Sequence, residues 1–252
     1  MTELLYLADV EEAYVTAFRG RVVALPPGGL VLDQTRFYPT GGGQPCDLGT
    51  LRRADGSTLN VTDVSKSGTA VVHRIARKGP PGPGPSLGEE LEGIVDWPRR
   101  HRHMRGHTLQ HLLSARIFAR TARRTRRASM NAKGAVIEVE GPWPAEVTVA
   151  DLTVEIQGYV DAPRPVRVRH LPRAEYELDP GGRSGLVPLP PQVDPVRVVE
   201  IEAADRCPCG GTHLRSTGEI GGFEILAPTE LAGGDLRVAF TLDERAPPTP
   251  IG

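Results

Sequence analysis

Two imidazole side chains stand four residues apart in the stretch 105–115, at His107 and His111. On an α-helix, residues four apart lie one above the other on the same face, so both rings can reach one ion or substrate. A second stretch, Cys207-Pro-Cys209-Gly-Gly-Thr-His213, adds thiol and imidazole groups. Zinc prefers these donors, and His107, His111, Cys209 and His213 make a set of four ligands.

A single pair of histidines at this spacing also occurs by chance on surface or core helices. The second pair argues against chance, because the chain holds only three cysteines and seven histidines and four of these residues fall into two compact pairs. Two kinds of metal site stay open. A catalytic zinc keeps one position for water or substrate, whereas four protein ligands can close a tetrahedral shell and serve the structure alone.

The motifs around these residues resemble the editing domain of alanyl-tRNA synthetase and its free-standing relatives, the alanyl-tRNA editing (AlaX) proteins. The stretches "HTLQHLL" at 107–113 and "CGGTHLRSTGEIG" at 209–221 fill the paired HxxxH and CxxxH motifs of that family. The similarity extends to "FYPTGGGQPCDLGTL" at 37–51 and "VDWPRRHRHMRGHT" at 95–108, and leaves only Pro-rich inserts and the tail unmatched. It implies hydrolysis, in trans, of a wrongly charged aminoacyl-tRNA at its acceptor end.

Either Cys207 or Cys209 could reach a metal ion, but a Cys-x-Cys spacing is too tight for both thiolates to bind one zinc in its common geometry. The family pattern selects Cys209 and leaves Cys207 as a small buried or half-exposed thiol. Asp205 is near enough in sequence to accept a hydrogen bond from a ligand and orient it. Thr108 and Thr212 are candidate substrate contacts, and the Gly211–Thr212 segment could offer amides or a hydroxyl to a developing oxyanion.

Three successive glycines, Gly41, Gly42 and Gly43, precede Gln44. They permit backbone conformations and close approaches that a Cβ would block. By itself the pattern is also typical of a flexible hairpin loop. The resemblance implies that this loop lies beside the editing pocket and helps to sense the amino acid.

The implied cofactor is Zn²⁺, which could activate a water, polarise the ester carbonyl or hold the substrate. With four protein ligands we favour positioning and substrate sensing. The family substrate is usually serine, and sometimes glycine, on the alanine tRNA, because a synthetase pocket cannot strongly reject an isostere that adds a hydroxyl. Two departures from the family pattern, Leu109-Gln110 after Thr108 and "RRASMNAKGAV" at 126–136, leave a threonyl-type or modified-threonyl-tRNA open as the substrate. Two rival functions also stay open: a zinc hydrolase for a different ester or amide, and a non-enzymatic tRNA-binding protein stabilised by zinc.

Basic residues dominate 99–133, where no Asp or Glu interrupts ten arginines and one lysine. Phosphate is the usual neutraliser of such a block, although acids elsewhere in the fold could balance it. The predicted RNA contacts are Arg99, Arg100, Arg102, Arg120, Arg123, Arg124, Arg126 and Arg127. His101 and His103 are expected to contact solvent or phosphate rather than metal.

Composition sets the fold class. The 252 residues include 29 glycines and 24 prolines, which favour many turns and a β-rich chain with few long helices. No apolar run is long enough to span a membrane, and the acidic N-terminus is unlike a secretory signal. Three cysteines do not form a disulfide framework. We therefore expect a cytoplasmic protein with a net charge of −1, an aminoacyl-tRNA partner and no stable protein partner.

We expect an α+β fold. Residues 1–95 are predicted as a small N-terminal β-barrel-like domain, 96–242 as a zinc-binding editing domain with an antiparallel sheet packed on helices, and 243–252 as a disordered tail. A helix should begin near Pro98, which suits a first turn, and bury Leu109, Leu112 and Leu113. The segments 134–141 and 147–162 read as strands with one short helix as an option, and 196–207 as a strand leading directly into the Cys/His cluster. Pro/Gly-rich stretches at 78–86 and 180–195 predict loops.

Overall fold

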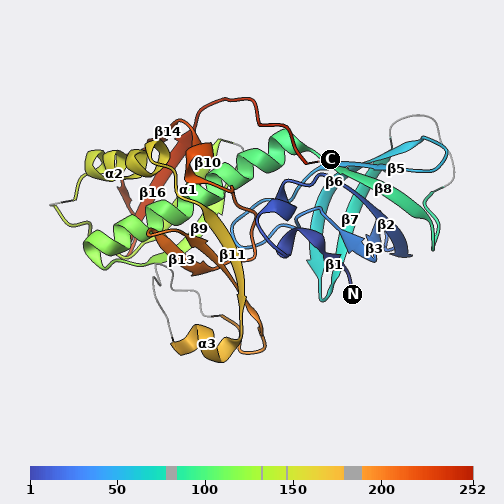
Figure 1. The fold of residues 1–252 in the computed structure, drawn as a ribbon, viewed down its shortest axis with the longest axis horizontal. Coiled ribbons are helices and arrows are strands. Elements are labelled where there is room, and N and C mark those ends of the chain that lie inside the picture. The colour runs from blue at the N-terminus through green and yellow to red at the C-terminus, as the bar shows by residue number, and fades with distance from the viewer. Residues whose placement is uncertain (78–83, 132, 146, 179–188, 252) are drawn as a thin grey trace. The chain divides into compact units, whose positions relative to one another are not determined.

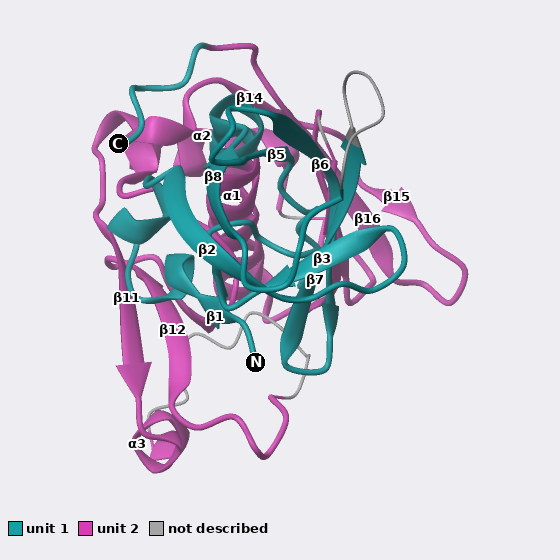
Figure 2. Ribbon diagram, turned by 90° about the vertical axis from the view of Figure 1, so that its right-hand side faces the viewer, with its two compact units in different colours: residues 1–102, 246–252 teal, residues 103–245 magenta. Residues whose placement is uncertain are grey.

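The computed structural model of the chain describes residues 1–77, 84–131, 133–145, 147–178 and 189–251 (Figure 1). Most of the two predicted Pro/Gly-rich loops lies outside these residues. The chain divides into two compact units, each described here by itself (Figure 2). Unit 1 comprises residues 1–102 and 246–252, and unit 2 comprises residues 103–245.

Unit 1 is built on a closed barrel of six strands, in the order β2-β3-β7-β6-β5-β8. The strands are β2 (Ala17–Ala24), β3 (Gly29–Leu32), β5 (Gly49–Arg52), β6 (Thr58–Ser67), β7 (Ala70–Arg77) and β8 (Glu90–Val95). All barrel pairs are antiparallel, and buried and exposed residues alternate along β2 as expected for a strand with one face in a core. The interior is apolar, with Phe18, Leu30, Phe37, Leu51 and Leu91 among its buried members.

Short elements complete unit 1. They are β1 (Glu3–Leu4), which pairs in parallel with β4 (Gln34–Thr35), and the 3-10 helices η1 (Leu5–Leu7) and η2 (Glu11–Ala13). The last residues of the chain also have partners. Trp97 Nε1 donates to the Pro248 carbonyl at 2.5 Å, and Ile251 N donates to the Tyr14 carbonyl at 3.0 Å. The sequence favoured disorder here because Pro-rich segments lack amide donors, but these contacts need only one indole and one amide.

Unit 2 is organised around the helix α1 (Trp97–Thr121), whose first residues belong to unit 1. Leu109, Leu112 and Leu113 are fully buried, as the spacing predicted, and each contributes roughly 1.5–3 kcal/mol through removal from water. Pro98 occupies the first turn, where its missing amide costs no hydrogen bond.

One sheet packs against α1. It runs in the order β14 (Phe223–Ile225), β16 (Leu236–Leu242), β10 (Gly134–Val139), β9 (Thr125–Met130), with β15 (Thr229–Glu230) also paired to β16. At Gly106 of α1 an added Cβ would lie 3.6 Å from Met130 Sδ and 3.8 Å from a Leu242 methyl. The sheet is antiparallel throughout, so the predicted α+β class is confirmed.

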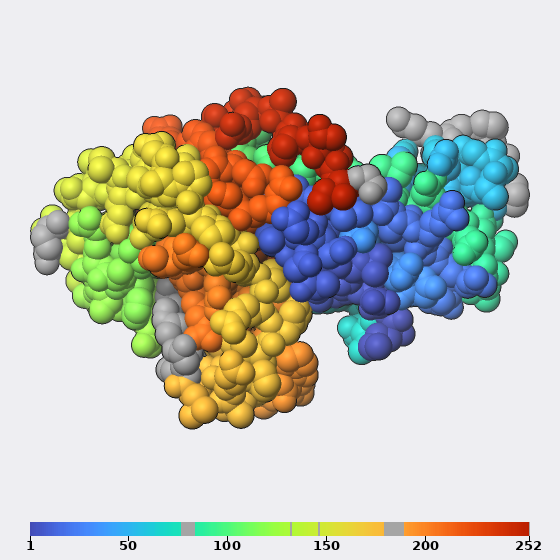
Figure 3. All heavy atoms as spheres, in the orientation of Figure 1, coloured from blue at the N-terminus to red at the C-terminus, as the bar shows by residue number. Residues whose placement is uncertain are grey.

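A second antiparallel sheet contains β11 (Val166–Leu171), β12 (Val196–Ile201) and β13 (Asp205–Pro208). Its far end carries α3 (Arg173–Leu178) and stands away from the body of unit 2 (Figures 1 and 3). Tyr176 of α3 packs on Leu171, Val196 and Val198. Unit 2 also contains the 3-10 helix η3 (Thr217–Ile220).

Two local predictions differ from the structure. The segment 147–162, expected as strands with one short helix as an option, forms the helix α2 (Val149–Asp161), because Thr148 and Asp151 make a reciprocal capping box that starts a helix. The strand expected to run straight into the Cys/His cluster ends at Ile201 instead. The chain turns there, with Ala203 at a φ of 55°, and returns as β13. No helix among the described residues is long and apolar enough to cross a membrane.

Candidate metal centre

Four side chains of ligand type meet in unit 2. One donor atom from each of His107, His111, Cys209 and His213 lies within 4.8 Å of the others. Cys209 Sγ is 3.5 Å from His107 Nε2 and 3.4 Å from His213 Nε2, and the His107 and His111 rings are 5.1 Å apart at their centroids. The three histidines are buried and Cys209 is half-buried.

The two halves of the cluster have different supports. His107 and His111 come from one face of α1, as predicted from their spacing. Cys209 follows β13, and its amide continues the strand pairing by donating to the Arg197 carbonyl at 3.1 Å. The chain then turns, and the Gly211 amide donates to Cys209 Sγ at 3.3 Å. A role of the Gly211–Thr212 segment at an oxyanion stays a prediction.

Outer contacts fix two of the imidazoles. Asp205 Oδ2 lies 2.9 Å from His111 Nδ1, the orienting contact that the sequence suggested, and leaves His111 Nε2 for a ligand. Thr108 Oγ1 lies 3.3 Å from His213 Nδ1 and accepts a hydrogen bond from Leu214 N at 3.1 Å. Both partners of Thr108 are thus protein groups, so Thr108 positions His213. Thr212 is fully buried beside His213.

The side chains of the cluster shift one another's pKa values. Burial alone would raise the pKa of the Cys209 thiol, but the positive charges of His107 and His213 lower it well below its usual value. Burial, with repulsion from His107, lowers the pKa of His213 well below its ordinary value. Burial acts to lower the pKa of His111, yet hydrogen bonds with Asp205 and Cys209 raise it to about 10. A thiolate among imidazoles is a donor set that fits zinc.

Cys207 behaves differently from Cys209. Burial, together with the negative charges of Asp205 and Cys209, raises the pKa of the Cys207 thiol well above its usual value. It does lie close to Asp205 and His111, with donor atoms within 4.8 Å of one another. Because a protonated thiol is a poor ligand, Cys209 is the better candidate of the two.

The glycine loop forms a defined turn in unit 1. Gly41 and Gln44 exchange backbone hydrogen bonds of 3.1 and 2.9 Å, and Gln44 is fully buried. Gly42 and Gly43 have φ values of 55° and 82°, which favour glycine. The Tyr38 hydroxyl donates to the Gly41 carbonyl at 2.7 Å. These hydrogen bonds fix the conformation of the turn, and its role beside an editing pocket stays a prediction.

Arg100 is not placed to contact RNA, which corrects one predicted contact. Its side chain is fully buried in unit 1 and forms an ion pair with the equally buried Asp47. Further guanidinium N–H groups donate to the carbonyls of Ala13 and Arg36. A buried guanidinium needs such partners, and here acceptors from the same unit supply them.

His101 and His103 are also buried, at 3% and 2% exposure, so the expected solvent or phosphate contacts are wrong for both. The His101 ring lies 5.2 Å from that of Trp97. Packing inside the protein outweighed the basic character of the surrounding stretch.

The other arginines of the block are divided between the two units. In unit 1, Arg99 is half-buried and donates to the Cys46 carbonyl at 3.0 Å, and Arg102 is half-buried. In unit 2, acids distant in sequence pair with several: Glu155 with Arg116 and Arg120, and Glu140 and Asp235 with Arg126. Arg123 is half-buried, whereas Arg124 and Arg127 are exposed. Acids therefore balance part of the block, and RNA binding by its exposed members stays a prediction.

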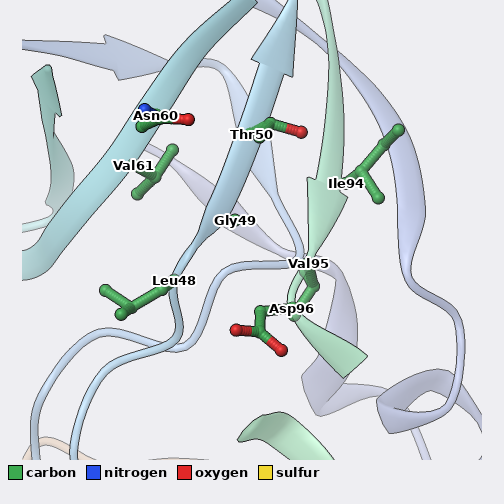
Figure 4. A pocket seen from close by; sticks show the side chains of 8 residues that line it. All are labelled: Leu48, Gly49, Thr50, Asn60, Val61, Ile94, Val95 and Asp96. Atoms are coloured by element: carbon green, nitrogen blue, oxygen red, sulfur yellow. The ribbon is translucent and has the colours of Figure 1, made fainter. Parts of the chain in front are cut away.

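A shallow hollow on the barrel of unit 1 offers little chemistry. It is lined by Leu48, Gly49, Thr50, Asn60, Val61, Ile94, Val95 and Asp96 (Figure 4). Asp96 is the one titratable group among these residues, and its carboxylate already accepts a hydrogen bond from Arg99 N at the start of α1. The Cys/His cluster is the stronger candidate site.

Comparisons with known proteins match both halves of the chain. A family model described as "Threonyl and Alanyl tRNA synthetase second additional domain" matches residues 196–238, and one described as "tRNA synthetases class II (A)" matches residues 11–99. The alanyl-tRNA editing protein AlaX-M of Saccharolobus solfataricus is 31% identical over 250 residues, covering 96% of this chain and 99% of that protein.

Longer proteins also match. The alanine–tRNA ligase of Pyrobaculum aerophilum is 35% identical over 248 residues, covering 92% of this chain and 26% of the ligase. That of Pyrococcus abyssi is 34% identical, covering 94% of this chain and 26% of the ligase. The chain thus spans about a quarter of the length of these ligases.

Proposed function

This chain belongs to the AlaX family of alanyl-tRNA editing proteins, and from that premise we propose that it is a trans-editing hydrolase for mischarged tRNA(Ala). The proposed reaction is hydrolysis of the ester between the amino acid and the 3′-terminal ribose. Seryl-tRNA(Ala) is the expected substrate, with glycyl-tRNA(Ala) second. The observation that supports this proposal is the convergence of His107, His111, Cys209 and His213 within 4.8 Å.

Those four residues would hold the zinc ion. When bound, zinc would polarise the ester carbonyl and help to position the substrate. The chain's own groups make the site rigid: Asp205 fixes the ring of His111, and Thr108 fixes that of His213. Because both rings are oriented by buried partners, the donor geometry is set before substrate arrives.

We infer that water is the nucleophile. The chain shows no Ser-His-Asp order that would suggest a covalent route, and Cys209 is already committed to the histidine cluster. Four protein ligands also favour positioning of the substrate over a permanent metal-bound hydroxide. In this proposal Thr212 and the Gly41–Gln44 turn sense the aminoacyl group, and the exposed arginines bind RNA phosphates.

Deacylation of charged tRNAs tests the proposal. Zinc-loaded protein should release serine from seryl-tRNA(Ala), and should leave alanyl-tRNA(Ala) intact. Threonyl-tRNA(Thr) tests the alternative substrate. His111→Ala or Cys209→Ala should abolish release while circular dichroism shows the wild-type fold. Cys207→Ala is the matched control, since it removes a neighbouring thiol outside the four-ligand set.

A different outcome would favour a non-enzymatic role. If the wild-type protein cleaves none of these substrates, and both Ala variants unfold, the Cys/His cluster serves only to stabilise an RNA-binding fold. The observation that supports this alternative is that all four candidate ligands are protein side chains and mostly buried, as in a structural metal site.

A further inference from the structure

A row of residues crosses the three-stranded sheet of unit 2 and ends at the candidate metal centre. His170 of β11 lies directly opposite Arg197 of β12. Arg197 in turn lies beside Cys209, whose amide donates to the Arg197 carbonyl at 3.1 Å. Residues opposite one another on antiparallel strands present their side chains on the same face. The row therefore leads from exposed His170, through half-buried Arg197, to a ligand of the cluster.

Arg197 holds the backbone of that ligand from two sides. Besides the backbone hydrogen bond, its guanidinium Nη1 donates to the Cys209 carbonyl. A guanidinium carries five N–H donors in a rigid fork, so one group can hold a carbonyl and bind an anion together. This contact places the permanent positive charge of a half-buried residue beside the backbone of Cys209.

The charges on the two faces of this sheet differ. On the face opposite to Arg197, Arg169 and Arg206 both pair with Glu200. On the face of Arg197, the strand positions are mostly apolar and buried, including Val166, Val199 and Ile201. Asp205 also lies on this face, and its Oδ2 is 2.9 Å from His111 Nδ1. Among the residues of these three strands, Arg197 is the one permanently cationic residue on the face that borders the metal centre.

We propose that Arg197 binds the phosphodiester 5′ to the terminal adenosine of the substrate tRNA. This inference rests on the proposed function, because the ester to be cleaved then lies at the Cys/His cluster. The phosphodiester belongs to the same nucleotide as the ester, one ribose away. A cation fixed beside Cys209 is thus placed to bind that phosphate while the ester reaches the metal.

Two small substrates isolate the phosphate contact. One is 3′-O-seryl-adenosine, which has no phosphate, and the other is the seryl ester of cytidylyl-(3′→5′)-adenosine, which has one. Wild-type protein should cleave the dinucleotide ester with the higher kcat/KM. Arg197→Gln should lose that preference by roughly 10- to 100-fold, as expected for one charge-assisted hydrogen bond, so that its kcat/KM falls further on the dinucleotide ester than on the phosphate-free ester. Arg197→Lys should keep part of the preference.

Arg169→Gln is the matched control. Arg169 lies on the neighbouring strand but on the opposite face, so its loss should leave the preference unchanged. Equal losses on both esters in Arg197→Gln would show that Arg197 only supports Cys209, and would overturn the inference. So would a wild-type protein that does not distinguish the two esters.

Salt dependence on the full substrate gives a second readout. For seryl-tRNA(Ala), the slope of log kcat/KM against log salt should fall by about 0.7 in Arg197→Gln, the value for one phosphate of a single strand. An unchanged slope would overturn the inference. This test also decides the question if the wild-type protein cleaves neither small ester. Failure of wild-type protein to cleave seryl-tRNA(Ala) itself would instead reject the proposed function.

Discussion

Replacing Arg100 by methionine should destabilise the protein rather than weaken RNA binding selectively. The guanidinium and the Asp47 carboxylate are both fully buried, and the same carboxylate accepts a hydrogen bond from Tyr38 N at 2.6 Å. Methionine has a similar length but neither charge nor donors. Arg100→Met would therefore leave a buried carboxylate without its cation and the carbonyls of Ala13 and Arg36 without a donor.

The expected loss is large. Removing one partner of a buried ion pair costs about 3–5 kcal/mol, against a total stability of roughly 5–15 kcal/mol for a domain. At about 2–4 °C per kcal/mol for a chain of this size, the midpoint of thermal unfolding should fall by roughly 6–20 °C. Urea unfolding followed by circular dichroism measures the same free energy independently.

Two further variants sharpen the test. Asp47→Leu combined with Arg100→Met removes both charges and should recover part of the loss, although Tyr38 N then loses its acceptor. Arg127→Met removes an exposed arginine of the same block and should leave stability within about 0.5 kcal/mol. The reasoning fails if Arg100→Met unfolds like the wild-type protein while its affinity for tRNA drops.

Two other predictions follow from buried histidines. Asp205→Asn should weaken zinc binding by about 10- to 100-fold, measured by competition with a chromophoric chelator, because it disturbs the carboxylate that orients His111; an affinity equal to that of the exposed control Glu202→Gln would contradict this. Burial lowers the pKa of His73 from its ordinary value of about 6.5 to about 4, so the unfolded chain takes up a proton at a higher pH than the folded protein. Neutral His73 therefore stabilises the folded protein fully above pH 6.5, and the free energy of unfolding should fall by about 3 kcal/mol as the pH drops towards 4. Urea unfolding of His73→Gln should lack this part of the loss of stability at acid pH.

The two halves of the Cys/His cluster could be predicted because each half consists of residues that are close together in the sequence. His107 and His111 need only one helix, and Cys209 and His213 need only one turn. Their meeting across more than a hundred residues could not be deduced from spacing, and the family resemblance supplied it. The supporting contact from Thr108 to His213 was missed for the same reason: nothing near Thr108 in the sequence indicates its partner.

The arginine block shows where local patterns fail. A run without acids looks like a surface for phosphate, but Asp47 lies 53 residues from Arg100, and Glu155 lies 35 from Arg120. Only the fold brings these pairs together. The helix α2 is a different case, because its capping signal Thr148-x-x-Asp151 was present, while the β-branched residues around it favoured strands. No sequence motif marked Arg197 as a site residue, because its proposed role depends on which residues lie opposite one another in the sheet.

The separation between the two halves of the Cys/His cluster has a consequence for synthesis. His107 and Cys209 are 102 residues apart, so a ribosome completes α1 long before it reaches the second pair. Of the four candidate ligands, the emerging chain then offers only His107 and His111, a weak chelate. In the proposed zinc site, tight loading would wait until His213 has been made and the sheet carrying Cys209 has closed on the helix, which would make metal uptake a late step in maturation.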